Sequence, residues 1–254
     1  MKKVYLVIRE GVVVAPEILQ YLETHFEIVQ YPEEPEFIVA CGGDGIIFWS
    51  SRKYRKLGVP FFGLNYGHIG FLLNRAILKV LEELSAGEVE IISQRMLKAV
   101  VYDRDNKEVT TAYAFNDFYF ERTNLQTARI RISIDGKVLF DPLICNGVVV
   151  ATAAGSTAYS ASAGGVILPV GTDSMVLTGI CPHIFHYWRT SELPVNSIVT
   201  LEAVDVKWRP VVFVAEGEVI PGAVKAEISY SDEVVRLMFA KSEKFREKVD
   251  GLMS

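Results

Sequence analysis

The stretch that decides the fold runs from residue 37 to residue 45 and reads Phe37-Ile38-Val39-Ala40-Cys41-Gly42-Gly43-Asp44-Gly45. Its first five residues form a continuous apolar run, which is typical of a strand buried on both faces of a parallel sheet. The glycines that follow let the backbone turn tightly and approach a ligand closely. A helix that begins after them presents unpaired N–H groups to an anion such as phosphate. We therefore predict a strand, a glycine turn carrying an aspartate, and a helix to about Leu57, before Gly58.

The segments around this stretch alternate between strands and helices. Pro16 suits the first turn of a helix, and Gly87 suits the end of another. The predicted strands cover residues 4–8, 26–31 and 59–64, and the predicted helices cover residues 16–25 and 77–86. This alternation predicts an α/β domain with a Rossmann-like parallel sheet and helices on its faces.

The pattern changes to strands near residue 90. Residues 128–134 alternate between apolar and polar side chains, and Asp135-Gly136 separates them from residues 137–140, which indicates a hairpin. Further strands are predicted at residues 148–151, 198–204, 211–215, 226–230 and 234–239. We therefore predict a β-rich, sandwich-like domain over residues 93–238, and a first domain made of residues 1–92 and 239–254. The charged tail, residues 242–253, is predicted to form a helix that returns to the first domain.

The composition excludes several classes of protein. The chain has 254 residues, half of them hydrophobic and 22% charged, so it is not a disordered protein. With 26 basic and 31 acidic residues and a net charge of −5, a nucleic-acid partner is not expected. No apolar run reaches the ~18 residues of a membrane span, so no membrane partner is expected. Three scattered cysteines and the lack of a signal-like N-terminus favour a cytoplasmic location.

Asp44 is unusual in a turn that binds only anions, because its charge repels phosphate. It makes sense if it holds a metal, accepts a proton from a hydroxyl group, or caps the following helix. Asn65, Gly67 and Gly70 follow the next strand, so we expect them on the same rim of the sheet as Asp44. A strand-to-helix turn that needs glycine explains them equally well.

Two further motifs lie in the β-rich domain. Asn116 and Asp117 stand among aromatic residues, which indicates either a ligand-facing bend or a surface edge strand. Residues 146–165 lead a strand into small and hydroxyl residues, with a helix expected from Ser156. Such residues are able to bind a diphosphate or a ribose, with Tyr159 against a ring, although a close-packed helix of small residues is the alternative. For Cys181-Pro182-His183 with His186, a structural or substrate-lining role is favoured over a metal site.

Taken together, these motifs resemble the NAD kinase family, which makes NADP from NAD, and they stand in the family's order. The glycine-aspartate motif alone is shared with diacylglycerol-type lipid kinases and phosphofructokinases, whereas the block from Gly155 to Ser160 is more specific. The matching segments are residues 42–45, 65–72, 95–97, 116–117, 152–165 and 180–183.

The resemblance implies that Mg-ATP phosphorylates the 2′-hydroxyl of the adenosine ribose of NAD, with Asp44 as the catalytic base. It implies that Gly42, Gly43 and Gly45 cradle phosphates, and it assigns no residue as a metal ligand. The other binding residues that it implies, some across a subunit boundary, are Asn65, Asn116, Asp117, Asn146, Ala154, Thr157, Ala158, Tyr159, Ser160, Ala161 and Ser162. The expected cofactors and substrates are Mg²⁺, ATP and NAD, and the expected assembly is a homodimer or homotetramer. A lipid kinase and a non-catalytic NAD-binding regulator remain the alternatives.

The chain departs from the family pattern at four positions. Ile46 replaces a threonine, Asn146 replaces an aspartate, and Ala154 lacks a hydroxyl. Trp49 stands where a basic residue is often found, and Arg52 or Lys53 is expected to substitute for it. These departures bear on the choice of phosphoryl donor more than on the NAD site.

Overall fold

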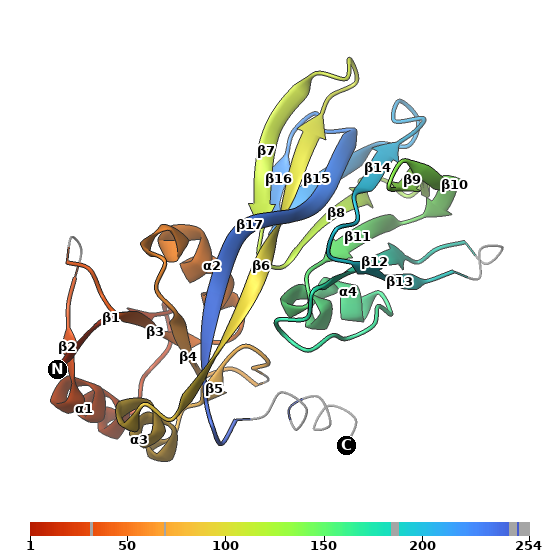
Figure 1. Cartoon of the computed structure of the whole chain (residues 1–254). Helices are drawn as coiled ribbons and strands as arrows, with labels where there is room; N and C mark the ends of the chain where they lie inside the picture. The colour runs from red at the N-terminus through yellow and green to blue at the C-terminus, as the bar shows by residue number, and fades with distance from the viewer. Residues whose placement is uncertain (31–32, 69, 184–187, 244–247, 249–254) are drawn as a thin grey trace. The chain divides into compact units, whose positions relative to one another are not determined.

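The computed structural model describes residues 1–30, 33–68, 70–183, 188–243 and 248 (Figure 1). The chain divides into two compact units, Met1–Gln94 with Val234–Ser254 and Arg95–Glu233, which we call the N-terminal unit and the β-rich unit. Two long strands, β6 (Val89–Tyr102) and β17 (Lys225–Ala240), belong to both. The chain therefore passes residue 92 inside a strand rather than in a linker, and the domain limits stay a prediction.

The N-terminal unit is built on a parallel sheet. Strand β3, whose six residues are all buried, lies between two neighbours, as its apolar run predicts. The paired strands follow the order β2 (Phe26–Ile28), β1 (Lys2–Ile8), β3 (Phe37–Gly42), β4 (Phe61–Asn65), and both β17 and the short β5 (Asn74–Arg75) pair with β4. The carboxyl ends of β3 and β4 therefore lie together, which positions the residues that follow them.

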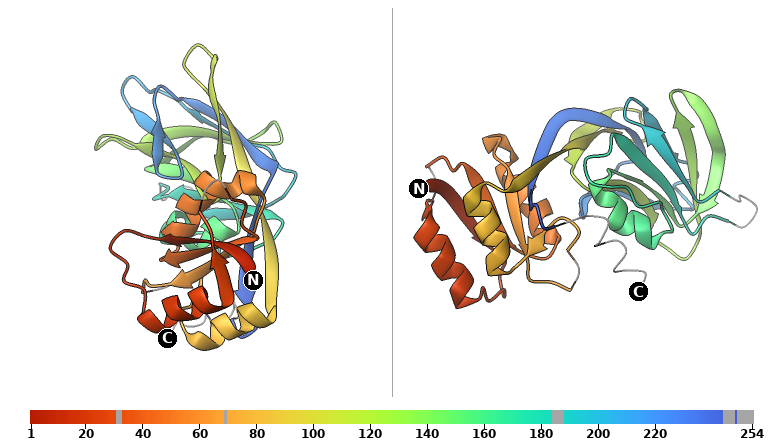
Figure 2. Two further views of the ribbon diagram at one scale, coloured as in Figure 1. Left: turned by 90° about the vertical axis from the view of Figure 1, so that its left-hand side faces the viewer. Right: turned by 60° about the horizontal axis from the view of Figure 1, so that its bottom comes forward.

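Helices cover both faces of this sheet, because alternate strand residues point to opposite sides. Helices α1 (Pro16–His25) and α3 (Leu78–Ala86) pack on the face that carries Val39 and Cys41 (Figure 2). Helix α2 (Gly45–Tyr54) packs on the other face, where a Cβ on Gly63 would lie 3.2 Å from Ile47. A short 3₁₀ turn, η1 (Arg55–Leu57), follows α2 and ends at Gly58, whose φ is +67°.

The β-rich unit has strands of two sheets around a shared core, which includes Phe118 and Val150 from one sheet and Ile130 from the other. The six-stranded sheet follows the order β13 (Thr190–Pro194), β12 (Ser174–Ile180), β11 (Gly147–Ala151), β8 (Asp117–Arg122), β15 (Val211–Ala215), β16 (Glu218–Ile220). The other strands are β7 (Glu108–Ala114), β9 (Ala128–Ile134), β10 (Lys137–Cys145) and β14 (Val199–Ala203), with the long β6 and β17. The predicted pairing of an α/β part with a β-rich part is thus confirmed.

Local predictions from the sequence met mixed outcomes. The hairpin at Asp135-Gly136 is confirmed, with positive φ at both residues. The prediction of two separate strands within residues 226–239 was wrong, because β17 continues through Ser231. The Ser231 hydroxyl donates to the Met96 carbonyl oxygen at 2.9 Å. Most of the predicted tail helix lies outside the described residues. In the part of the chain that is described, no helix is long and apolar enough to cross a bilayer.

Candidate active site

Asp44 follows strand β3 and immediately precedes helix α2. Its two carboxylate oxygens accept backbone N–H groups from a distant loop: Phe71 donates to Oδ2 and Leu72 to Oδ1, both at 3.0 Å. Asp44 itself has helical dihedral angles, and its side chain makes no capping hydrogen bond to α2. The alternative that Asp44 caps the helix was therefore wrong. The carboxylate is instead held in a fixed position at the carboxyl end of the sheet.

The environment of Asp44 favours a stronger base than a free aspartate. Burial raises the pKa of Asp44, while the N–H groups of Leu72 and Phe71 and the charge of Lys248 oppose that rise. The net direction is upward from the ordinary value. A carboxylate with a raised pKa is better matched to accepting a proton at neutral pH.

The loop after β4 lies on the same rim as the glycine turn, as the sequence predicted. The Tyr66 N–H donates to the Gly42 carbonyl oxygen at 2.8 Å, and a Cβ on Gly67 would lie 3.4 Å from Gly43 Cα. The Asn65 side chain accepts the Gly67 N–H at 2.9 Å, so it organises this turn. Gly70 is required here, because a Cβ would lie 2.7 Å from Asn65 Cγ.

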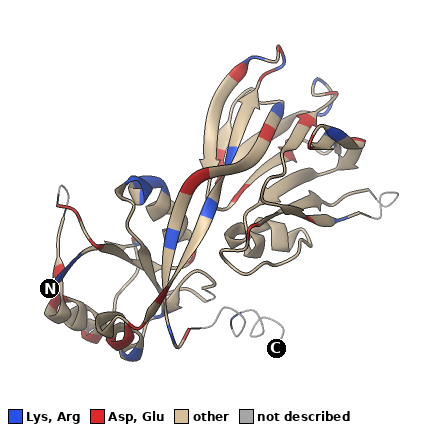
Figure 3. Cartoon of the chain, in the orientation of Figure 1, with Lys and Arg blue, Asp and Glu red and all other residues tan. Residues whose placement is uncertain are grey.

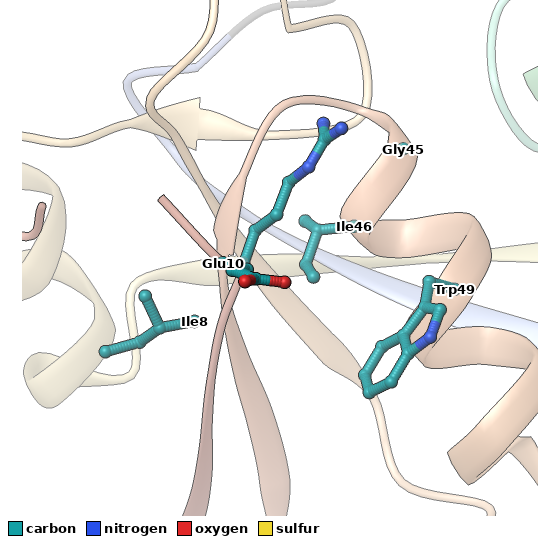
Figure 4. A pocket seen from close by; sticks show the side chains of 6 residues that line it. Ile8, Glu10, Gly45, Ile46 and Trp49 are labelled. Atoms are coloured by element: carbon teal, nitrogen blue, oxygen red, sulfur yellow. The ribbon is translucent and has the colours of Figure 1, made fainter. Parts of the chain in front are cut away.

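A cavity of about 650 Å³ lies beside the start of helix α2. Figure 4 shows Ile46 and Trp49 of α2 across from Ile8 and Glu10, with Gly45 at the helix start. Arg9 also lines this cavity, and its Nη1 would lie 3.9 Å from a Cβ on Gly45. At the start of α2, the Ile46 and Ile47 N–H groups donate to the Gly43 and Asp44 carbonyl oxygens at 2.9 and 3.0 Å. The cavity therefore combines an arginine with a partly exposed indole.

The expected replacements for the missing basic residue, Arg52 and Lys53, lie elsewhere. Both are in the last turn of α2, about 10 Å along the axis from its start, and Figure 3 shows the basic residues of this helix in blue. The Lys53 ammonium sits over the rings of Trp49 and Tyr54, at 4.9 and 5.0 Å. The guanidinium group of Arg9 lies at the start of the helix instead. Arg9 follows β1, far in sequence from the glycine-aspartate motif, and was not predicted from the sequence.

In the β-rich unit, Phe115 and Asn116 form a bend between β7 and β8, and Asp117 is the first residue of β8. Strand β8 pairs with β11 on one side and β15 on the other, so the edge-strand alternative was wrong. Glu216, which the sequence argument also missed, holds this bend by accepting the N–H groups of Phe115 and, at 2.7 Å, Asn116. The Asn116 Oδ1 atom is buried and has no partner among the described residues, which suits a ligand contact.

Asp117 is predicted to make stability depend on pH. Burial, and then the neighbouring Glu216 carboxylate, raise the pKa of Asp117 to about 7. Because the folded pKa exceeds the unfolded value of about 3.9, the folded state is penalised as pH rises from about 4 to 7, and fully above that. The free energy of unfolding of Asp117→Asn, relative to that of wild type, should therefore increase from pH 5 to pH 8. The expected increase is up to about 3 kcal/mol, because each unit of pKa difference corresponds to about 1.4 kcal/mol.

Denaturant unfolding of the ligand-free protein at both pH values measures this gain. Asp232→Asn, at an exposed aspartate of the same unit, is the control. A difference between Asp117→Asn and wild type that stays the same at both pH values would contradict the prediction.

The small-residue block folds into tight turns rather than the helix predicted from Ser156, namely a 3₁₀ turn, η2 (Ala154–Thr157), and a single turn, α4 (Tyr159–Ser162). The Thr152 hydroxyl donates to the Phe115 carbonyl at 2.6 Å and accepts the Gly155 N–H at 3.0 Å. Gly155 lies so close to the bend that a Cβ would be 2.1 Å from the Asn116 carbonyl oxygen. The block and the Asn116 bend therefore form one structural element.

The predicted binding residues of this unit differ in their surroundings. The Ser160 hydroxyl is buried against Thr178 Oγ1 at 3.0 Å, so it holds the turn. The Tyr159 hydroxyl donates to Glu121 at 3.1 Å, and burial and then Glu121 raise the pKa of Tyr159 to about 12. Of the other predicted residues, Ala154 is buried and the rest are half-buried or exposed. Asn146 follows β10, and Ala158 lies between the two turns. The turn η2 contains Ala154 and Thr157, and α4 contains Ala161 and Ser162.

Two arginines of β9 and the Cys181-Pro182-His183 segment do not add to the site. Arg129 pairs with Asp205 at 2.6 Å, and Arg131 pairs with Asp141 at 2.7 Å and with Glu202 at 2.8 Å, so both arginines already bridge carboxylates. His186 lies outside the described residues. Among the residues that are described, no three His, Cys, Asp or Glu side chains gather as a metal site.

Comparison with known proteins gives consistent matches. The model of the ATP-NAD kinase C-terminal domain matches residues 116–188. An NAD kinase of Cereibacter sphaeroides is 36% identical over 93% of this chain and 92% of its own length, and one of Brucella melitensis is 34% identical over 85% and 84%. The fold matches yeast NADH kinase complexed with NADH (TM-score 0.81, 19% identity, 100% of this chain and 87% of that one). It also matches an Archaeoglobus fulgidus NAD kinase in complex with ATP (TM-score 0.75, 23% identity, 98% and 97%).

The fold, the glycine-flanked aspartate and these relatives define a phosphotransferase. The chain belongs to the NAD kinase family. The lipid-kinase alternative is set aside by this membership.

Proposed function

We propose that the protein transfers the γ-phosphoryl group of Mg-ATP to the 2′-hydroxyl of the adenosine ribose of NAD. In this reaction a bond forms between the ribose 2′-oxygen and the γ-phosphorus, the bond from that phosphorus to ADP breaks, and Asp44 takes the hydroxyl proton. The observation that carries the proposal is the Asp44 carboxylate, half-buried and fixed by two backbone N–H groups. Phosphoryl transfer needs alignment and charge neutralisation more than covalent chemistry, and a fixed base supplies alignment.

The residues of the β-rich unit are proposed to hold NAD. The unpartnered Asn116 Oδ1 and the Tyr159 hydroxyl supply polar contacts, while Thr152 and Glu216 keep the bend and the small-residue turns in place. The remaining residues of the NAD site are proposed as the family resemblance implies. We also propose a homodimer or homotetramer located in the cytoplasm.

Magnesium is proposed to enter as part of the donor. Mg²⁺ in such enzymes is usually bound through one or two carboxylates together with substrate phosphates. Both oxygens of Asp44 accept backbone N–H groups, and the described residues hold no cluster of three metal-binding side chains. The chain's own contribution is therefore the cation Arg9 and the start of helix α2, beside the cavity that would receive the donor.

Incubation with Mg-ATP and NAD, followed by an assay for NADP, tests the function directly. NADP formation supports the kinase. Tight binding of NAD without turnover, over a range of Mg-ATP concentrations, would support the non-catalytic regulator instead.

The donor site is tested by replacing Arg9. Arg9→Gln should raise the KM for Mg-ATP by about tenfold or more, because a charge-assisted hydrogen bond contributes about 1.5–3 kcal/mol. The KM for NAD should change little. Arg52→Gln, which removes an arginine from the other end of α2, is the matched control and should leave both KM values near wild type. Equal effects of the two substitutions would argue against a donor site at this cavity.

A further inference from the structure

Lys248 contacts the loop that holds Asp44. Its ammonium group donates a hydrogen bond to the Leu73 carbonyl oxygen. Leu73 directly follows Phe71 and Leu72, the two residues whose N–H groups hold the Asp44 carboxylate. The Asp44 carboxylate and the Lys248 ammonium therefore bind the same three-residue segment. The carboxylate accepts the N–H groups of Phe71 and Leu72, and the ammonium donates to the carbonyl oxygen of Leu73.

The Lys248 side chain is well shielded and is held by several partners. Only 16% of it is exposed, and its Nζ lies 3.3 Å from a Glu243 oxygen and 5.2 Å from the Phe239 ring centroid. Glu243 is 3% exposed and also accepts a hydrogen bond from Arg75 Nε at 2.7 Å. A lysine buried to this degree is unfavourable unless it is paired, and its partners here are a carboxylate and a carbonyl.

The charges around this cluster come from three parts of the N-terminal unit. Arg75 belongs to β5, Glu243 and Lys248 follow β17, and Arg9 follows β1 and lies near Gly45. Among the described charged groups, Lys248 is the one whose charge lowers the pKa of Asp44. In turn, burial lowers the pKa of Lys248, while the charges of Glu243 and Asp44 oppose that shift.

We propose that Lys248 is a positioning residue for the catalytic base: it fixes residues 71–73, and its positive charge favours the ionised form of the Asp44 carboxylate. Glu243 and Lys248 thereby complete the catalytic end of the N-terminal unit. Without the ammonium, the half-buried carboxylate keeps its two N–H groups but loses its compensating charge. Asp44 then binds a proton more readily and is less often available as a base. The inference rests on the proposed role of Asp44.

The test compares three variants across a range of pH. In Lys248→Met the acid limb of the kcat profile should move up by about one pH unit, so that kcat falls by up to about tenfold at pH values below the wild-type limb and recovers at pH values above it. Lys248→Arg, which keeps the charge, should restore at least half of that shift. Lys241→Met replaces an exposed lysine two residues before Glu243 and should leave the profile unchanged. An acid limb in folded Lys248→Met that matches wild type, or equal shifts in the Met and Arg variants, would overturn the inference.

A second measurement does not depend on turnover. Carboxyl ¹³C NMR of aspartate-labelled protein, with the Asp44 signal assigned by its loss in Asp44→Asn, follows the titration of Asp44 itself. The midpoint should be higher in Lys248→Met than in wild type, and an unchanged midpoint would overturn the inference. If wild type makes no NADP while this midpoint still moves, the proposed function fails and the coupling between Lys248 and Asp44 stands.

Discussion

Asp44→Asn is expected to lower kcat by at least about two decades, because a general base typically contributes 10²–10⁴-fold. The asparagine has nearly the shape of aspartate but cannot take the ribose hydroxyl proton. Affinity for NAD should change modestly, since most of the residues proposed to hold the dinucleotide belong to the β-rich unit. Steady-state kinetics at saturating Mg-ATP, with NAD binding measured by calorimetry, gives both quantities.

The same variant also tests the structural role of Asp44. The amide oxygen can accept one of the two N–H groups from Phe71 and Leu72, but the amide nitrogen would face the other. One buried N–H is then left unsatisfied, at a cost of about 1–3 kcal/mol in the free energy of unfolding. Turnover should therefore be measured well below the melting temperature of the variant.

Two other outcomes for Asp44→Asn have different meanings. Partial rescue by raised Mg²⁺ would indicate that Asp44 mainly orders the metal of the donor. Near-normal turnover would remove Asp44 as the base. The capping role, which sequence alone left open, no longer competes, because the carboxylate makes no bond to helix α2.

The local parts of the fold could be predicted because their causes are local. Helix α1 begins at Pro16 and ends at His25 as predicted, since proline suits the first helical turn. The hairpin at Asp135-Gly136 was predictable because both residues tolerate a positive φ. By contrast, Ser231 looks like a turn residue, and only its bond to Met96, 135 residues away in sequence, shows why the strand continues there.

The residue types of the candidate site could be predicted from the sequence, but the distant residues that hold them in place could not. A glycine-flanked aspartate after a buried strand is a local pattern. The N–H groups that hold it come from 27 and 28 residues away, and Lys248 reaches Leu73 from 175 residues away. Glu216 holds Asn116 across 100 residues. No local periodicity or spacing records such contacts, because they exist only once the sheets have formed.

Gly155→Ala is expected to have the largest structural effect of any single methyl group added to the small-residue block. The new Cβ would lie 2.1 Å from the Asn116 carbonyl oxygen, which also accepts the Thr152 N–H at 2.9 Å. One of the two backbones must move, and overpacking of this kind costs about 3 kcal/mol. For a chain of this size, that loss lowers Tm by roughly 6–12 °C.

The same displacement should weaken NAD binding, because Asn116 and Asp117 move with the bend. We expect the Kd for NAD to rise at least about tenfold, in parallel with the fall in Tm. Gly43→Ala is the matched control for stability: its Cβ would meet nothing within 4 Å and its φ is not positive, so Tm should stay near wild type. Calorimetric melting and NAD titration measure both effects. A Gly155→Ala protein with wild-type Tm and wild-type affinity for NAD would contradict this prediction. It would show that the small-residue turns and the Asn116 bend are not coupled, and that NAD binding does not depend on their close approach.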